Sequence, residues 1–206
     1  MENVRIKKVV NFIFEMGHLK REKNRGFALV GVKDPNTIAE HSLRAAQIGF
    51  ILAEMENDKA GEEIVSAEKV AAIMIIHDNA ETRVGDQHKV GARYFSKKEA
   101  EKLAFEEQIA GLGERIEVKW RKYMGEHDGR DTKEGIVAQD ADWLEAAFQA
   151  KEYLELGYES VQVWISNVEA AVETESAKEI LKVMRETKFT DWWKDLKKMT
   201  YEKLGK

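Results

Sequence analysis

The sequence has no cysteine and only one proline, Pro35, among its 206 residues. The lack of cysteine excludes disulfide bonds, thiolate metal sites and cysteine nucleophiles. Proline interrupts helices because it removes a backbone donor, so its scarcity favours long helical segments. Alternation of β-branched and polar residues, which is typical of strands, is also scarce. We therefore predict an all-α protein whose 206 residues form one domain.

Charge of either sign is not in large excess, since the net charge is -5. A protein without a general basic surface is unsuited to non-specific binding of a nucleic-acid backbone, so we expect no nucleic-acid partner. A small phosphorylated ligand would need only local positive charge. Apolar runs fall short of the length that spans a membrane, and the N-terminal segment mixes charges into its apolar residues, unlike a signal peptide. We expect a cytoplasmic protein without a membrane partner.

One apolar run ends abruptly in polar residues. Residues 70–76 are all apolar, and His77, Asp78 and Glu81 follow them. The alanines and the polar start at residue 66 favour a helix over residues 66–80. On such a helix His77 and Glu81 share a face, and Asp78 lies about 100° from His77. Several polar groups gathered at the end of one apolar run indicate a functional site.

A second histidine lies near the start of another predicted helix. Thr37 and Glu40 have the spacing of a capping box, which indicates a helix start. His41 then falls on the apolar stripe of that helix. A single buried histidine is more often a hydrogen-bonded core residue than a ligand. Two histidines at the ends of neighbouring apolar helices instead favour a shared metal site.

Two aspartates lie within a further predicted helix over residues 131–153. Asp140 and Asp142 are two residues apart, or about 200° round a helix, so both cannot face one site. Periodicity leaves the choice open, although Asp140 lies nearer the apolar stripe. Together with His41, His77 and Asp78, either aspartate completes a set of two imidazoles and two carboxylates. Such a set suits manganese, cobalt, iron or zinc better than calcium.

The remaining segments carry less chemistry in their sequence. The helix over residues 3–19 should cover the core, and the basic segment 18–27 is a connecting loop. The helix from Ser96 to about Leu112 should present a solvated charged face. His127 and Asp128 lie between glycines, so we interpret them as a surface turn. Further helices are predicted over residues 114–124, 159–173, 177–186 and 191–204.

The ordered motifs resemble those of the HD-domain metal-dependent phosphohydrolases, and more closely their 5'-deoxynucleotidase branch. The resemblance runs from about residue 19 to residue 155, with the helices over residues 159–204 packed on this core, and makes residues 1–206 a single HD domain. It also implies an all-helical fold. The motifs are Glu40-His41-Ser42, His77-Asp78-x-x-Glu81, Gly85-Asp86 and Asp142-Trp143-Leu144-Glu145, with Leu19-Lys20 and Arg25 preceding them.

The resemblance implies roles for individual residues. The metal ligands would be His41, His77, Asp78 and Asp142, which hold one divalent ion per subunit. Mn²⁺ or Co²⁺ is the expected ion, and Mg²⁺, Zn²⁺, Fe²⁺ or Ni²⁺ are alternatives. Glu81 matches the acid/base and Asp86 its partner beside the substrate, while Arg25 and Phe27 match the positions that hold the nucleotide. The family is usually dimeric, which implies a homodimer.

The expected activity is hydrolysis of (deoxy)ribonucleoside 5'-monophosphates to nucleoside and phosphate. One alternative is another HD-type reaction, on nucleoside triphosphates, cyclic nucleotides or guanosine tetraphosphate. The short chain lacks the insertions expected of many such enzymes, which favours a small monophosphate. A second alternative is a non-catalytic nucleotide-sensing module. Because every ligand and acid/base position is filled, the sequence favours an enzyme.

Overall fold

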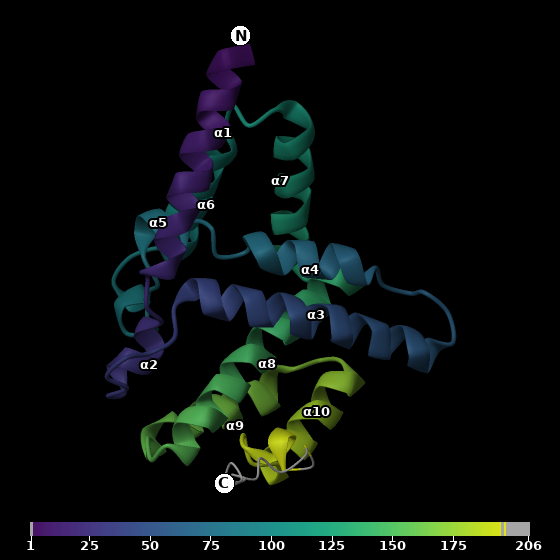
Figure 1. The fold of residues 1–206 in the computed structure, drawn as a ribbon. Coiled ribbons are helices and arrows are strands. Elements are labelled where there is room, and N and C mark those ends of the chain that lie inside the picture. Colours follow the sequence, from purple (N-terminus) through teal and green to yellow (C-terminus); the bar gives the residue numbers. More distant parts are fainter. Residues whose placement is uncertain (1, 195, 197–206) are drawn as a thin grey trace, which may run out of the picture.

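The structure, a computed structural model, describes residues 2–194 and 196 of the chain (Figure 1). In this part the regular structure is helical, with no strand, so the prediction of an all-α fold is confirmed. The predicted helix over residues 191–204 begins with a single 3-10 turn, Asp191–Trp193, and its end lies outside the described residues. The α-helices are α1 Glu2–Met16, α2 Arg25–Leu29, α3 Ile38–Ala60, α4 Ala67–Ile76, α5 Glu81–Val84, α6 Lys97–Ile109, α7 Glu114–Gly129, α8 Lys133–Glu155, α9 Gln162–Ala171 and α10 Glu175–Glu186.

Helices α3, α4 and α8 form the centre of the molecule. Each contributes a fully buried apolar side chain to one cluster: Leu52, Ile73 and Leu144. Burial of such a side chain stabilises the fold by about 1.5–3 kcal/mol. Helices α9 and α10 lie on one side of this centre, and α1, α6 and α7 extend from the other (Figure 1). The central helices therefore carry the residues that the sequence analysis singled out.

The packing of α3 on α4 depends on a glycine. A Cβ atom at Gly49 would lie 2.8 Å from Cγ1 of Val70 and 3.4 Å from Cβ of Ala141. The first distance is shorter than carbon atoms tolerate, so α3 can approach α4 this closely only because residue 49 has no side chain.

The start of α3 is fixed by the predicted capping box. The Thr37 backbone N–H donates to Oε2 of Glu40 over 2.7 Å, and the Glu40 backbone N–H donates to Oγ1 of Thr37 over 3.2 Å. Loss of such a cap costs about 1 kcal/mol. The cap places His41 in the first turn of α3, with its side chain buried.

The predicted helix over residues 66–80 is interrupted. Ser66 caps α4 as expected, but α4 ends at Ile76 and α5 begins only at Glu81. Between them the chain tightens: the Asn79 N–H donates to the Ile76 carbonyl and the Glu81 N–H to the Asp78 carbonyl, three residues back. The expectation that His77 and Glu81 share one helical face is therefore wrong. The break turns the side chains of the motif in directions that one straight helix would not give.

Helix α1 covers the core only in part, since Val9 and Phe12 are partly buried against an apolar cluster that includes Ile76 and Ile109. None of its residues is buried, and Val4 and Phe14 are 74% and 78% exposed. Side contacts hold it to α6 and α7, including the ring of Phe12 against Trp120 at 5.5 Å between centroids. An amphipathic pattern shows only that one face is apolar, and here most of that face remains open.

None of the described helices is both long enough and apolar enough to cross a membrane.

Candidate metal centre and active-site cavity

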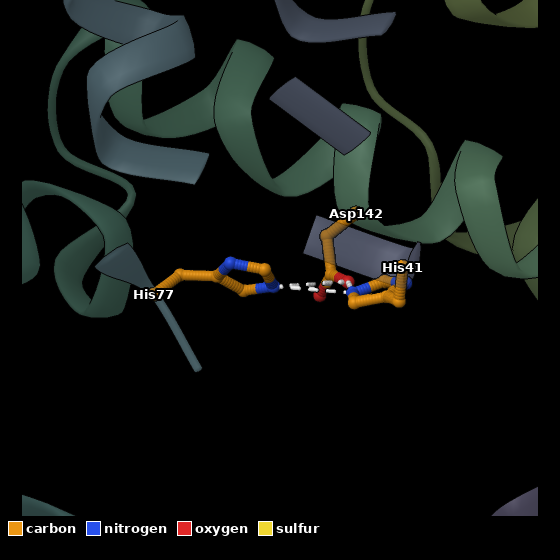
Figure 2. A group of neighbouring side chains, drawn as sticks. All are labelled: His41, His77 and Asp142. Carbon is orange, nitrogen blue, oxygen red and sulfur yellow. Dashed lines mark hydrogen bonds and ion pairs between the residues drawn. The ribbon is translucent and has the colours of Figure 1, made fainter. Parts of the chain in front are cut away.

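Two histidines from different elements point the same atom at one place (Figure 2). Nε2 of His41, in α3, lies 3.2 Å from Nε2 of His77, in the turn after α4. Oδ1 of Asp142, in α8, lies 3.1 Å from the first nitrogen and 3.7 Å from the second. The three residues form a cluster that could hold a metal ion. Segments about 100 residues apart in sequence thus meet at one point.

Asp78 approaches the same two nitrogens. Its Oδ2 lies 3.1 Å from Nε2 of His77 and 3.5 Å from Nε2 of His41. The structure therefore brings together all four residues for which the family resemblance implies a metal-binding role. Ligands at about 2.1 Å from one ion are separated by roughly 3.0 to 3.4 Å in octahedral or tetrahedral geometry, and the distances between these atoms are close to that range.

Asp140 lies elsewhere and has a different task. Its carboxylate accepts hydrogen bonds from the backbone N–H groups of Glu173 and Thr174 and from the Thr174 hydroxyl. These bonds hold the connection between α9 and α10 against α8. Of the two aspartates that periodicity left open, Asp142 faces the histidines and Asp140 faces away.

The chemistry of the two imidazoles calls for a cation between them. Nδ1 of His77 donates to the carbonyl oxygen of Met74 over 2.7 Å, and Nδ1 of His41 lies 2.5 Å from Oε2 of Glu145. When each Nδ1 carries the proton, each neutral Nε2 presents a lone pair. Two lone pairs and two carboxylates that face one another repel unless a positive charge lies among them. The residues therefore fit a divalent metal ion.

The pKa values of the clustered residues also indicate that positive charge is favoured among them. Burial opposes a charged imidazole, but Asp78 and Asp142 raise the pKa of His77 to about 10. Burial likewise opposes charge on His41, whose pKa Glu145 and Asp142 nevertheless raise well above its usual value. In turn, hydrogen bonds from His41 and His77 overcome burial and hold the pKa of Asp142 well below its ordinary value. A divalent ion would supply the same compensation and displace the imidazole protons.

A buried ion pair stands behind His41. Glu145 is 1% exposed, and its Oε1 accepts two hydrogen bonds from Arg44, at 2.9 and 2.7 Å. Arg44 also donates to Glu152 and Gln149. The guanidinium balances the charge of the carboxylate, and Glu145 in turn fixes the ring of His41.

Glu81 lies in the wall of the cavity beside the cluster. It is 3% exposed, and its Oε1 accepts a hydrogen bond from Nζ of Lys97 over 3.0 Å. Its Oε2 is buried and has no hydrogen-bond partner among the described residues. Burial and the nearby Asp78 raise the pKa of Glu81 to about 9. A carboxyl group that holds its proton near neutral pH can serve as an acid.

Asp86 and Arg25 meet through the backbone. Asp86 lines the cavity and accepts the Arg25 backbone N–H over 2.6 Å. The Arg25 guanidinium instead pairs with Glu22, and its side chain is 51% exposed. It lies over Gly85, whose φ of +71° and lack of a Cβ leave room for it. The structure thus places Arg25 outside the cavity wall and gives no support to its predicted contact with the nucleotide.

Phe27 is not placed as predicted. It is fully buried, with its ring 5.1 Å from that of Tyr153 and 5.3 Å from that of Trp164. A side chain with no exposed surface cannot touch a ligand. The prediction that Phe27 contacts the substrate is therefore wrong. Trp164, which stacks on it and packs beside Gly26, lines the cavity instead.

The cavity of about 540 Å³ joins the cluster to an apolar wall. Ligand sites commonly have volumes of about 300–1,000 Å³. The polar end includes His41, Asp78 and Asp142. The apolar wall is formed by Leu29, Trp143, Val163, Trp164 and Val168.

The interpretation of His127 and Asp128 as a surface turn is wrong. Helix α7 continues to Gly129, and the side chain of His127 is only 12% exposed. Its ring lies 5.5 Å from the ring of His77, centroid to centroid. The glycines on both sides suggested a turn, but packing of α7 against α4 and α8 keeps the segment helical. His127 thus supports His77 from the side.

The HD-domain family model matches residues 16–184. The chain belongs to the HD-domain family. It is thus a metal-dependent phosphohydrolase, and the four residues with the implied metal-binding role all lie inside the matched range. Among curated proteins it is 29% identical over 171 residues to the 5'-deoxynucleotidase YfbR of Escherichia coli, covering 79% of this chain and 84% of that protein.

Solved structures have a similar fold. A conserved hypothetical protein from Pyrococcus furiosus is 30% identical, with a TM-score of 0.72, over 86% of this chain and 99% of that one. The HD phosphohydrolase DatZ of cyanophage S-2L, solved with dA and one catalytic Zn²⁺, is 14% identical with a TM-score of 0.52 over 84% and 96%. The second likeness shows the fold alone.

Sequence reasoning missed three residues that the structure places at the site. Lys97 was assigned to a solvated helix face, although it lies one position after a capping serine, where a side chain can turn back to the preceding loop. Glu145 belongs to a recognised motif, and its spacing of three from Asp142 puts both on one face of α8. Trp164 carried no signal, because only the fold brings α9 beside α2.

Proposed function

We propose that the protein is a 5'-deoxynucleotidase, which hydrolyses (deoxy)ribonucleoside 5'-monophosphates to nucleoside and inorganic phosphate. The observation that carries this proposal is one cavity with an apolar aromatic wall at one end and, at the other, three residues of the candidate metal site, His41, Asp78 and Asp142. A nucleoside monophosphate likewise has a charged end, the phosphate, and a flat aromatic end, the base. The similarity to YfbR supports the same substrate class.

His41, His77, Asp78 and Asp142 would hold the ion, with Mn²⁺ or Co²⁺ as the expected metal. When bound, a divalent ion neutralises phosphate oxygens and acidifies a water molecule. In the reaction the oxygen of water forms a new bond to phosphorus, and the bond from phosphorus to the 5' oxygen breaks. Glu81 carries the proton between the water and the leaving oxygen, and Asp86 lies beside it in the cavity wall.

Phosphate release from a panel of nucleotides tests the proposal. Protein loaded with Mn²⁺ or Co²⁺ should release inorganic phosphate from deoxynucleoside 5'-monophosphates, and little from 3'-monophosphates or cyclic nucleotides. Release of only pyrophosphate or triphosphate would contradict the monophosphatase and assign one of the alternative HD reactions. Absence of turnover on the whole panel, with nucleotide still bound, would make the protein a sensor.

A homodimer is part of the proposal. The exposed apolar residues of α1, such as Val4 and Phe14, offer surface that a second copy could cover. Light scattering after size-exclusion chromatography should give twice the mass of 23.6 kDa. A mass of one chain at micromolar concentration would contradict the dimer.

A further inference from the structure

The charged end of the cavity contains more carboxylates than a phosphate would tolerate alone. The carboxylates of Asp78, Asp86 and Asp142 line it beside Glu81, which holds its proton near neutral pH, and the phosphate of a nucleotide brings up to two further negative charges. One divalent ion cannot offset this sum. Of the lysines and arginines that the structure describes, only Lys89 and Lys97 line the cavity.

Lys97 is the lysine that lies among these carboxylates. Its Nζ is 3.0 Å from Oε1 of Glu81, 3.1 Å from Oε1 of Glu101 and 3.8 Å from Oδ1 of Asp86. Its side chain is 28% exposed. An ammonium group has three donors, and only two of these contacts are short enough to occupy one each. The third donor is available to a ligand in the cavity.

Glu81 provides a second, independent sign of a ligand at this place. Its Oε2 is buried and lacks a hydrogen-bond partner in the described part of the chain, while its Oε1 accepts from Lys97. Buried polar atoms are nearly always satisfied, by protein, water or ligand. The unpartnered oxygen of Glu81 and the third donor of Lys97 therefore belong to two side chains that line the same cavity.

We propose that Lys97 binds a phosphoryl oxygen of the substrate and so takes the position that the sequence assigned to Arg25. The guanidinium of Arg25 is held by Glu22 away from the cavity wall, whereas the ammonium of Lys97 adjoins the residue that moves the proton. An approaching phosphate accepts from the third donor of the ammonium, while the contacts with Glu81 and Glu101 remain. This inference rests on the proposed function only in that the substrate carries a phosphoryl group.

Binding of inorganic phosphate tests this role without turnover. In calorimetry on the Mn²⁺-loaded protein, Lys97→Met should weaken phosphate binding by roughly 10- to 100-fold, as expected for loss of a charged hydrogen bond. Bound manganese should stay at one ion per chain. Lys98→Met is the matched control, since Lys98 is the exposed neighbour, and should bind phosphate like the wild type. With a nucleotide substrate, Lys97→Met should raise KM, and Lys97→Arg should restore most of the loss.

A purely structural lysine would give a different result. Lys97→Met alone removes the hydrogen-bond donor of Glu81 and the counter-charge of Glu101, which destabilises the start of α6. The double variant Lys97→Met with Glu101→Gln removes one negative charge with the ammonium, and should fold, retain metal and still bind phosphate weakly. Wild-type phosphate affinity in the double variant, or no phosphate binding by the wild type, would overturn the proposal. Failure of the nucleotidase assay would leave this binding measurement intact.

Discussion

His41 and His77 present the same atom to the same point, yet their rings are held in different ways. Nδ1 of His41 meets the buried carboxylate of Glu145, which Arg44 holds in turn. Nδ1 of His77 donates to the backbone carbonyl of Met74, three residues earlier in the chain. One imidazole thus depends on a network of side chains and the other on local backbone geometry.

The difference shows that a side-chain substitution can change the support of His41 but not that of His77. A carboxylate behind a histidine increases the electron density on the far nitrogen, so Glu145 should strengthen the bond from His41 to a metal. A backbone carbonyl behind a histidine increases the electron density on the far nitrogen less than a carboxylate does. The support of His77 cannot be removed by a side-chain change, because it depends on the turn that separates α4 from α5. Five predictions test this comparison, beginning with the largest effect.

Removal of either imidazole should abolish metal retention. His41→Ala and His77→Ala each leave an incomplete shell and unbalanced carboxylates, so purified protein should contain far less than one ion per chain by elemental analysis. His88→Ala is the control, because His88 lines the same cavity but its Nδ1 accepts the Gly91 N–H. Retention of a full ion in either ligand variant would remove that histidine from the site.

The two aspartates of α8 should separate metal binding from stability. Asp142 adjoins both histidines, so Asp142→Ala should lose the metal. Asp140→Ala should keep it, and should lower the free energy of unfolding by about 1–3 kcal/mol, because it removes a charged acceptor from the backbone N–H groups of Glu173 and Thr174. Elemental analysis and chemical unfolding of the metal-free proteins measure both. The reverse pattern of metal loss would make Asp140 the ligand.

A change at Glu81 should affect turnover and spare both histidines. Glu81→Gln keeps the shape of the side chain but cannot exchange the proton, so kcat should fall by roughly 100-fold or more, as for loss of a positioned acid/base. Metal content and binding of a deoxynucleoside monophosphate should stay near wild type. Loss of the ion would instead show that Glu81 is a ligand.

A change at Glu145 should weaken only the His41 side of the site. Glu145→Gln removes the charge behind His41 and should raise the Kd for Mn²⁺ by roughly 10- to 100-fold. Glu152→Gln is the matched control, since Glu152 also accepts a hydrogen bond from Arg44 but His41 is not among its partners. Equal effects of the two substitutions would assign the loss to Arg44 and not to the ring of His41.

His127 should give the smallest effect. Its ring packs against His77, and both ring nitrogens lack hydrogen-bond partners among the described residues. An aromatic contact of this kind contributes about 0.5–1.5 kcal/mol, so His127→Leu should change metal affinity by less than about tenfold. His127→Phe keeps the ring and should match the wild type in the same titration. A complete loss of metal in His127→Phe would show that a nitrogen of His127 binds the ion.

Much of this site could be predicted because helix starts are local features. The capping residues Thr37 and Ser66 placed His41 and the apolar run correctly, and the spacing of the motifs identified the cluster. Secondary structure that depends on distant packing was missed. The turn at His77–Ala80 and the extension of α7 through His127 follow from contacts with other helices, which no window of sequence contains.

The direction in which a side chain points was the other property that could not be predicted from the sequence. Arg25 and Phe27 occupy expected positions in sequence, but Glu22 draws the first away from the cavity and the core encloses the second. Lys97 shows the converse, because a basic residue on a polar helix was predicted to be solvated and lies among carboxylates. The charge pattern of a sequence predicts which residues share a helix face, but not which other residues that face contacts.

The close contact of α3 with α4 at Gly49 connects residues that touch no ligand with the preference of the site for one metal ion. His41 lies on α3 and His77 directly follows α4, so the separation of these two helices also sets the separation of the two Nε2 atoms. A Cβ atom at residue 49 would lie 2.8 Å from Val70, so any side chain there must push α3 and α4 apart. A shift of a few tenths of an ångström is comparable to the difference in bond length between ions of different radius. We therefore expect Gly49→Ala to change the relative affinities for divalent cations, although residue 49 does not line the cavity.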